Sequence, residues 1–85
     1  MPIVHRHLLI EGRVQGVGFR WSLREKAHEL GLDVRARNRD DGSVEAWIGG
    51  PLEAVDKLTV WAHCGPARAR VDRVVCQDEW PSGPE

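Results

Sequence analysis

The chain has 85 residues and a net charge of −1, with 29% charged and 41% hydrophobic residues. This length has room for one small domain with a simple core, which we expect to span residues 1–85. The balanced charge gives no overall field that would attract nucleic acid or an anionic membrane, and nothing resembles a membrane span or a signal peptide. We therefore expect a cytoplasmic protein. The sequence does not fix the oligomeric state, and a small monomer is the expectation.

The spacing of the apolar residues predicts six elements. In chain order, these are a strand over 3–14, a helix over 19–30, a strand over 32–39, a strand over 44–48, a helix over 52–62 and a strand over 71–76. The sequence Asp-Asp-Gly-Ser at 40–43 predicts a tight turn, so the second and third strands form a hairpin. Gly49-Gly50-Pro51 is expected to end the third strand, and residues 80–85 are expected to form a tail.

The order β-α-β-β-α-β predicts an α+β, ferredoxin-like fold, in which a four-stranded antiparallel sheet carries both helices on one face. Right-handed crossovers place the third strand between the first and the second. The first and second strands then run parallel, so their C-terminal ends lie at the same edge of the sheet. Residues that follow the first strand can therefore meet residues at the end of the second.

The glycine-rich stretch Gly12–Arg20 lies where the first strand gives way to the first helix. Gly16 and Gly18 leave little side-chain bulk in the turn, so backbone N–H groups can converge there. The helix N-terminus adds unpaired N–H groups and partial positive charge, and the guanidinium of Arg20 can grip two oxygens of a phosphate. The stretch thus predicts a phosphate site, but the same glycines also suit a plain turn. It matches neither the dinucleotide-binding nor the P-loop pattern.

Asn38 interrupts an otherwise apolar row that Leu32, Val34 and Ala36 form on one face of the second strand. One interpretation is that its side chain caps the turn that follows. The other is that its amide, which both donates and accepts hydrogen bonds, holds a water molecule or a substrate oxygen.

The two cysteines, Cys64 and Cys76, do not form a disulfide framework, and the sequence leaves open whether they pair with each other. Zinc needs about four ligands, and no paired cysteine or histidine spacing supplies them. His5 and His7 would point the same way on a strand, but two ligands make a weak metal site. We expect two structural thiols, surface histidines and no metal.

Two stretches resemble the signatures of the acylphosphatase family. Gly12–Arg20 resembles G-x-V-Q-G-V-x-F-R, and Leu30–Glu45 resembles the second signature, G-x-V-x-N-x-x-D-G-x-V-E. Both occur in the expected order, and with the predicted elements the resemblance covers nearly the whole chain. The sequence departs from the family at Val34-Arg35-Ala36, where Gly, Trp and Val are common; this affects packing and substrate access more than the chemistry.

The resemblance implies that acyl phosphates, the mixed anhydrides of a carboxylic acid and phosphoric acid, are hydrolysed to a carboxylate and inorganic phosphate without a metal or cofactor. The small-molecule substrate and phosphate are the implied partners, with no nucleic acid or membrane. The loop would wrap the phosphoryl group with backbone N–H groups, Arg20 would bind its oxygens, and Asn38 would hold the attacking water. The implied catalytic residues are Arg20 and Asn38, and the implied phosphate-binding residues are Gln15, Gly16, Val17, Gly18, Phe19 and Arg20.

No side chain in the two signatures is an evident general base. We therefore hypothesise that the phosphate of the substrate accepts the proton of the water. If an enzyme base were required instead, Asp40 and Asp41 would be the candidates.

A non-catalytic module that binds anions or RNA is the alternative, because ferredoxin-like sheets also serve in RNA recognition. Arg35, Arg37 and Arg39 share the other face of the second strand and, with Trp47, would form a basic, stacking surface. The aromatic pattern of RNA-recognition sheets is absent, however, and arginines on a solvent-facing strand are usually solvated or paired with carboxylates such as Glu45.

Overall fold

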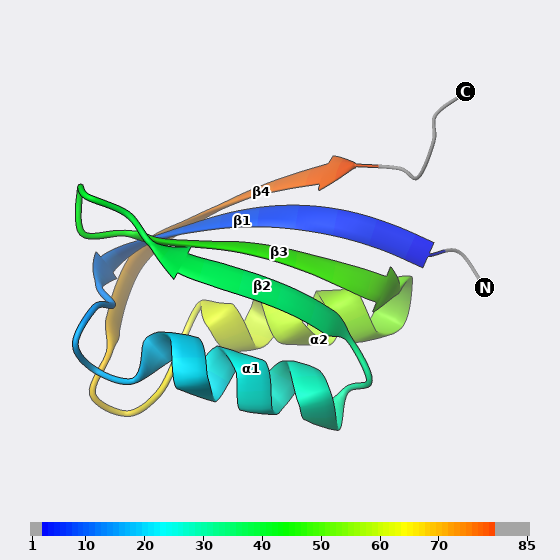
Figure 1. Cartoon of the computed structure of the whole chain (residues 1–85), viewed down its shortest axis with the longest axis horizontal. Helices are drawn as coiled ribbons and strands as arrows, with labels where there is room; N and C mark the ends of the chain where they lie inside the picture. Colours follow the sequence, from blue (N-terminus) through cyan, green and yellow to red (C-terminus); the bar gives the residue numbers. More distant parts are fainter. Residues whose placement is uncertain (1–2, 80–85) are drawn as a thin grey trace.

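The six predicted elements all form, in the predicted order (Figure 1). The computed structural model describes residues 3–79, and the predicted tail at 80–85 lies outside them. The elements are β1 (Ile3–Arg13), α1 (Phe19–Glu29), β2 (Asp33–Asn38), β3 (Val44–Pro51), α2 (Leu52–Ala62) and β4 (Arg70–Glu79).

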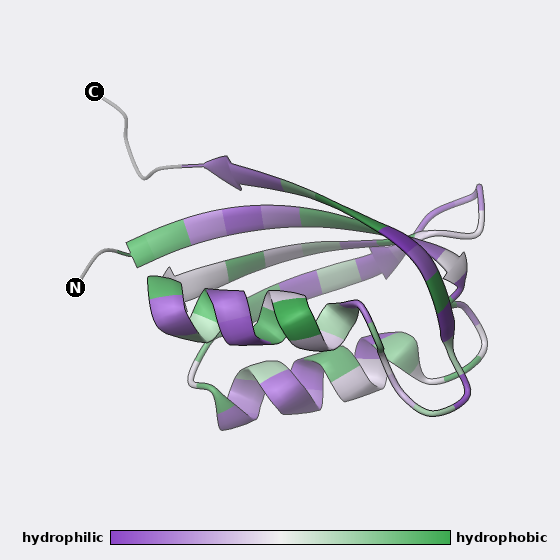
Figure 2. Cartoon of the chain, turned by 180° about the vertical axis from the view of Figure 1, so that it is seen from behind, coloured by the Kyte–Doolittle hydropathy of each residue, from purple (hydrophilic) through white to green (hydrophobic). Residues whose placement is uncertain are grey.

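The strands form one sheet in the order β2-β3-β1-β4, with every neighbouring pair antiparallel. Both helices pack on the same side of this sheet, as Figures 1 and 2 show from opposite directions. Because β3 separates β1 from β2 and pairs antiparallel with both, β1 and β2 run parallel. The predicted α+β, ferredoxin-like arrangement is therefore confirmed. No helix within residues 3–79 is long and apolar enough to cross a membrane.

The core lies between the sheet and the two helices. One side of each helix is apolar and buried, because residues three or four apart share a helix face. The buried core residues are Leu8, Ile10, Val14, Phe19, Leu23, Ala27, Leu32, Val44, Ala46, Ile48, Val55, Leu58 and Ala62. Val14 and Phe19, which flank the glycine turn, are each only 1% exposed, so both ends of that turn are fixed in the core.

The predicted end of β3 is wrong. The strand does not stop before Gly49 but continues to Pro51, which pairs with the first residue of β1. The two glycines pair with β1 like the other residues of β3. Both positions are crowded, which favours glycine over a residue with a side chain. A Cβ atom on Gly49 would lie 3.1 Å from the ring of His5, and one on Gly50 would lie 2.4 Å from a methyl group of Leu32.

The predicted end of β4 is also wrong, because the strand runs beyond Cys76 to Glu79. Its apolar alternation ends earlier, but backbone pairing with β1 continues until Glu79 lies opposite His5. The remaining predicted ends differ from the observed ones by no more than one residue.

The C-terminal end of β1 contains a β-bulge between Glu11 and Gly12, where the pairing with β4 shifts by one residue. Gly12 has a φ of 132°, and a Cβ atom on it would lie only 2.2 Å from the carbonyl oxygen of Arg70. Glycine is therefore required for the two strands to approach this closely. Just beyond the bulge, the chain enters the glycine turn.

Candidate active site

The turn Gln15–Gly18 connects β1 to α1 and forms the candidate anion site. Gly16 and Gly18 are left-handed, with φ of 73° and 76°, a conformation that strains other residues. Gly18 is the N-cap of α1; no side chain within residues 3–79 caps this helix, and its first turn carries no acidic residue. The first N–H groups of α1 therefore keep their capacity to bind an anion.

A pocket of about 330 Å³ lies between this turn, the start of α1 and the end of β2. The residues that line it are Val14, Gly16, Gly18, Phe19, Arg20, Trp21, Arg24 and Asn38. The two predicted catalytic residues thus line one cavity, although they are far apart in the sequence. The parallel directions of β1 and β2 bring these two segments to the same edge of the sheet.

Arg20 and Asn38 are both exposed. The ion pairs of the described residues leave Arg20 without a carboxylate partner, so its guanidinium is available to a ligand. The backbone bonds that close the turn after β2 run from the N–H of Arg39 to the carbonyl of Ser43 at 2.8 Å and from Gly42 to Arg39 at 3.2 Å. They do not use the side chain of Asn38.

Not all of the predicted phosphate-binding residues line this pocket. Gln15 and Val17 line a neighbouring depression, together with Arg13, Gly16 and Arg68. Phe19 lines the main pocket, but its buried ring packs against Trp61 at a centroid distance of 5.6 Å. The atoms that Phe19 offers to an anion are therefore those of its backbone.

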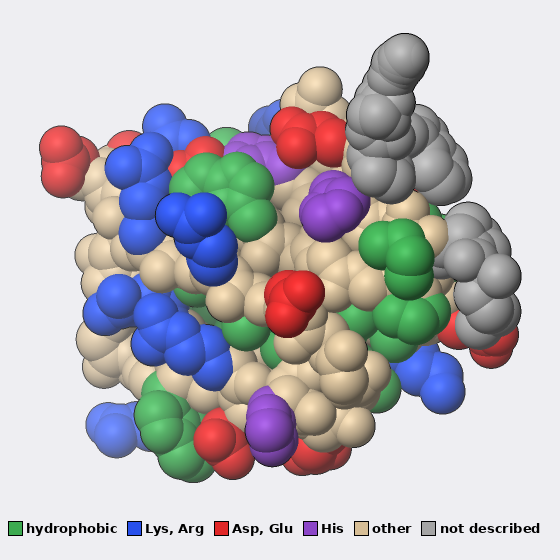
Figure 3. Space-filling model, turned by 45° about the vertical axis from the view of Figure 1, so that its right-hand side comes forward, with side chains coloured by type: hydrophobic (Ala, Val, Ile, Leu, Met, Phe, Trp, Pro, Cys, Tyr) green, Lys and Arg blue, Asp and Glu red, His purple; other side chains and the backbone are tan. Residues whose placement is uncertain are grey.

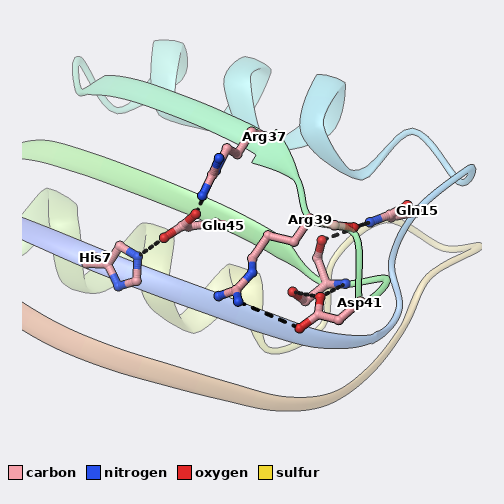
Figure 4. A network of polar contacts seen from close by, with 7 residues as sticks. His7, Gln15, Arg37, Arg39, Asp41 and Glu45 are labelled. Atoms are coloured by element: carbon pink, nitrogen blue, oxygen red, sulfur yellow. Dashed lines mark hydrogen bonds and ion pairs between the residues drawn. The ribbon is translucent and has the colours of Figure 1, made fainter.

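The side chain of Gln15 has a role that the sequence does not indicate. Its Nε2 atom donates hydrogen bonds to the carbonyl oxygens of Arg39, at 2.7 Å, and Ser43, at 2.9 Å (Figure 4). The amide thus ties the glycine turn to the β2–β3 hairpin and leaves only the backbone N–H of Gln15 for the predicted anion contact. Sequence reasoning misses this tie because the two partners lie 24 and 28 residues away and are backbone atoms.

The two candidate general bases lie beside the main pocket, in a depression that they line together with Asn38. Asp41 accepts hydrogen bonds from the hydroxyl of Ser43 at 2.5 Å and from its backbone N–H at 2.9 Å. These two contacts, the hydroxyl first, lower the pKa of Asp41. A lowered pKa makes Asp41 a weaker base at neutral pH, and neither Asp40 nor Asp41 lines the pocket of Arg20.

The arginines on the open face of β2 are partly neutralised by carboxylates. The Nε atom of Arg37 lies 2.7 Å from one oxygen of Glu45, and the Nε2 atom of His7 lies 2.6 Å from the other (Figure 4). These contacts, that with His7 first, lower the pKa of Glu45. Arg37 also lies 5.9 Å from the ring centre of Trp47. Arg37 and Trp47, two members of the surface that an RNA-binding module would use, are thus engaged in contacts within the sheet.

Several Lys and Arg side chains lie on the left of the view in Figure 3, with some Asp and Glu side chains beside them. At the glycine turn itself, Arg13 and Arg68 line one pocket and Arg20 and Arg24 line the other, and no acidic residue among those described lines either. The local charge there favours an anionic ligand, although the net charge of the chain is −1.

Residues 3–79 contain no group of three or more His, Cys, Asp or Glu side chains placed to hold a metal ion. Cys64 and Cys76 are both free thiols, so they do not pair. Both are exposed, and neither belongs to the core cluster.

Comparisons with known proteins agree on one family. The sequence model of the acylphosphatase family matches residues 6–85. An acylphosphatase of Thermococcus kodakarensis is 53% identical over 85 residues, which cover all of this chain and 93% of that protein. An acylphosphatase of Thiobacillus denitrificans is 59% identical over 68 residues, 80% of this chain and 76% of that protein. The structure of an acylphosphatase from Coxiella burnetii superposes with a TM-score of 0.88 at 36% identity, covering 92% of this chain and 82% of that one.

Proposed function

The chain belongs to the acylphosphatase family, and on that premise we propose that it hydrolyses acyl phosphates with Arg20 and Asn38 as its catalytic residues. The observation that carries this proposal is the single pocket that these two residues share with Gly16 and Gly18. A guanidinium, a helix N-terminus and a carboxamide there offer the groups that a phosphoryl transfer to water needs.

In the proposed reaction, the oxygen of a water molecule attacks phosphorus and forms a new P–O bond. The bond between phosphorus and the bridging oxygen breaks, and its electron pair leaves with the carboxylate. One proton of the water ends on a phosphate oxygen, so that RC(O)OPO₃²⁻ and H₂O give RCOO⁻ and H₂PO₄⁻. A carboxylate is a good leaving group, so the reaction needs little acid catalysis at the bridging oxygen.

Each part of the pocket has a separate role in this scheme. Arg20 and the N–H groups at the start of α1 hold the phosphoryl oxygens and stabilise their charge in the transition state. Asn38, on β2, orients the water by donating to it or accepting from it. Gln15 is a positioning residue, because its two hydrogen bonds keep the hairpin that carries Asn38 in register with the turn.

The proton of the water passes to the phosphate of the substrate rather than to a side chain. The lowered pKa of Asp41 and the position of Asp40 and Asp41 outside the pocket of Arg20 support this assignment. Replacing each aspartate by asparagine should leave the shape of the pH–rate profile unchanged. Loss of one limb in either variant would contradict substrate assistance.

The direct test measures phosphate release from benzoyl phosphate in the presence of a metal chelator. Arg20→Ala should lower kcat/KM by at least about 10²-fold, and Arg20→Lys should restore little, because a point charge cannot replace the planar fork. Asn38→Ala should lower kcat while the inhibition constant of inorganic phosphate stays within about twofold, because the amide is assigned to the water.

Arg35→Ala is the matched control, since Arg35 is exposed on the other face of β2 and lines a different cavity. It should keep wild-type turnover. Near-normal turnover in both Arg20→Ala and Asn38→Ala would remove the two assignments, whereas a wild-type protein that releases no phosphate would remove the proposed activity.

We also propose that the protein acts as a cytoplasmic monomer whose partner is the small-molecule substrate, without nucleic acid or membrane. The net charge of −1 and the pairing of Arg37 with Glu45 argue against nucleic acid and membrane as partners. Sedimentation should give a mass near 9.6 kDa. Salt-dependent binding to RNA without phosphate release from benzoyl phosphate would instead favour the binding module.

A further inference from the structure

The pocket of Arg20 and Asn38 contains two side chains that the proposed reaction does not use. These are Trp21 and Arg24, which both lie on the first two turns of α1 and both line the pocket. A phosphoryl group and a water molecule account for the other polar groups of the site. The acyl part of the substrate therefore has to lie against what is left of the lining.

Packing does not account for Trp21. Its side chain is 66% exposed, whereas Trp47 is 37% exposed and contacts His7, and the half-buried Trp61 packs against the ring of Phe19. Only about a third of Trp21 is covered by the rest of the protein, and the face of an indole binds planar groups well. Beside a reaction centre, it offers a flat apolar platform.

Arg24 adds a second positive charge to the same wall. It lies one turn beyond Arg20 on α1, and residues four apart on a helix are neighbours on its surface. Like charges at this spacing repel, and the ion pairs of the described residues provide neither arginine with a carboxylate. Arg20 suffices for the phosphoryl group, so Arg24 is free to meet an anionic group elsewhere on the substrate.

The geometry of the reaction places the acyl group on this wall. In-line displacement keeps the attacking water and the leaving oxygen on opposite sides of phosphorus. The water is assigned to Asn38 on β2, whereas Trp21 and Arg24 line the pocket from α1. We therefore assign the leaving carboxylate to the α1 side of the pocket.

We propose that Trp21 and Arg24 form an acyl-group subsite, which selects acyl phosphates whose acyl group is planar and carries a negative charge of its own. This inference rests on the proposed function, because it assigns the acyl half of a substrate whose phosphoryl half lies at Arg20. The subsite determines specificity and leaves the chemistry at phosphorus unchanged.

The test compares kcat/KM for three substrates, namely acetyl phosphate, benzoyl phosphate and 4-carboxybenzoyl phosphate. Wild type should prefer them in increasing order. Trp21→Ala should lower the ratio of benzoyl to acetyl kcat/KM by about threefold to tenfold, and Trp21→Phe should retain most of it, because an aromatic face remains. Arg24→Gln should lower the ratio of 4-carboxybenzoyl to benzoyl kcat/KM by about twofold to fivefold, and the wild-type preference should shrink at high salt.

Matched controls separate this subsite from general effects. Val60→Ala removes an apolar side chain that is 69% exposed on α2, and Arg35→Gln removes an exposed arginine outside the pocket; neither should change a ratio. The inhibition constant of inorganic phosphate should stay at the wild-type value in the Trp21 and Arg24 variants.

Equal losses on all three substrates, or a weaker affinity for phosphate that accounts for the loss, would overturn the acyl-group subsite. Unchanged ratios in Trp21→Ala and Arg24→Gln would overturn it as well while leaving the proposed hydrolysis standing. A wild-type protein that releases phosphate from none of the three would instead refute the proposed function itself.

Discussion

Replacing Gln15 by methionine removes the amide that joins the glycine turn to the β2–β3 hairpin and keeps a side chain of similar length. The lost contacts are two hydrogen bonds, to the carbonyl of Arg39 at 2.7 Å and to that of Ser43 at 2.9 Å. Each carbonyl keeps a second donor, since Gly42 donates to Arg39 at 3.2 Å and Arg39 donates to Ser43 at 2.8 Å. The substitution therefore leaves neither carbonyl without a hydrogen-bond donor, and the stability that is lost is that of the two hydrogen bonds from Gln15.

Two ordinary hydrogen bonds contribute about 2 kcal/mol to the free energy of unfolding. For a domain of this size, about 1 kcal/mol shifts Tm by about 4–8 °C, so Tm of Gln15→Met should fall by about 8–16 °C. Activity should fall as well, because Gln15 joins the two segments that carry the catalytic residues. Asn38 lies at the end of β2, where the turn of the β2–β3 hairpin begins, and Arg20 lies just beyond the glycine turn. A misplacement of about 1 Å costs as much as 10²-fold, so we expect kcat/KM for benzoyl phosphate to drop by about tenfold or more.

The assay is thermal unfolding together with phosphate release at a temperature where both proteins are folded. Gln77→Met, an identical exchange at an exposed position of β4, is the matched control and should change neither quantity. A Gln15→Met protein with wild-type Tm and kcat/KM would show that the Gln15 amide neither stabilises the fold nor positions the hairpin. A lower Tm with unchanged kcat/KM would show that the amide stabilises the fold without positioning Asn38.

Three further substitutions address the bulge, the glycine turn and the ion pair of the sheet. Gly12→Ala should lower the free energy of unfolding in urea by about 2–4 kcal/mol, because its Cβ would meet the carbonyl of Arg70 at 2.2 Å. Gly16→Ala should cost only about 1–2 kcal/mol, since its Cβ meets nothing within 4 Å and only the left-handed backbone is strained; equal costs would contradict this distinction. The lowered pKa of Glu45 means that its carboxylate stabilises the fold above its unfolded pKa of about 4.3 and ceases to do so as pH falls through the folded pKa. Glu45→Gln should therefore be less stable than wild type at pH 7, by about 1 kcal/mol, and the difference should disappear as pH falls through the folded pKa of Glu45; a gap that does not shrink in acid would count against the contacts with His7 and Arg37.

The sequence predicts the elements of this fold because their signals are local. The alternation along residues 32–39 and the turn at 40–43 specify a hairpin without reference to the rest of the chain. The end of β3 is mispredicted at Gly49–Pro51 because the structure of these three residues depends on distant parts of the chain. They read as a break in isolation, but their place in β3 depends on how closely β1 and Leu32 approach them.

The candidate site divides in the same way. The position of Arg20 in the first turn of α1 and that of Asn38 at the end of β2 follow from periodicity and strand direction, so their meeting at one edge is predictable. The bond from Gln15 to the hairpin and the contact between His7 and Glu45 are not, because each depends on the register between distant strands. Sequence spacing carries no information on which carbonyl a glutamine amide reaches.

The glycine turn is only four residues long, and a fully buried side chain lies immediately before it and immediately after it. Val14 and Phe19 cannot leave their places without opening the interior of the protein, so we expect the glycine turn to have no separate melting transition. Heat or denaturant should therefore abolish phosphate affinity and tertiary structure in one cooperative step. The binding site of an acylphosphatase built in this way is preorganised, because it has the same shape before and after a substrate binds.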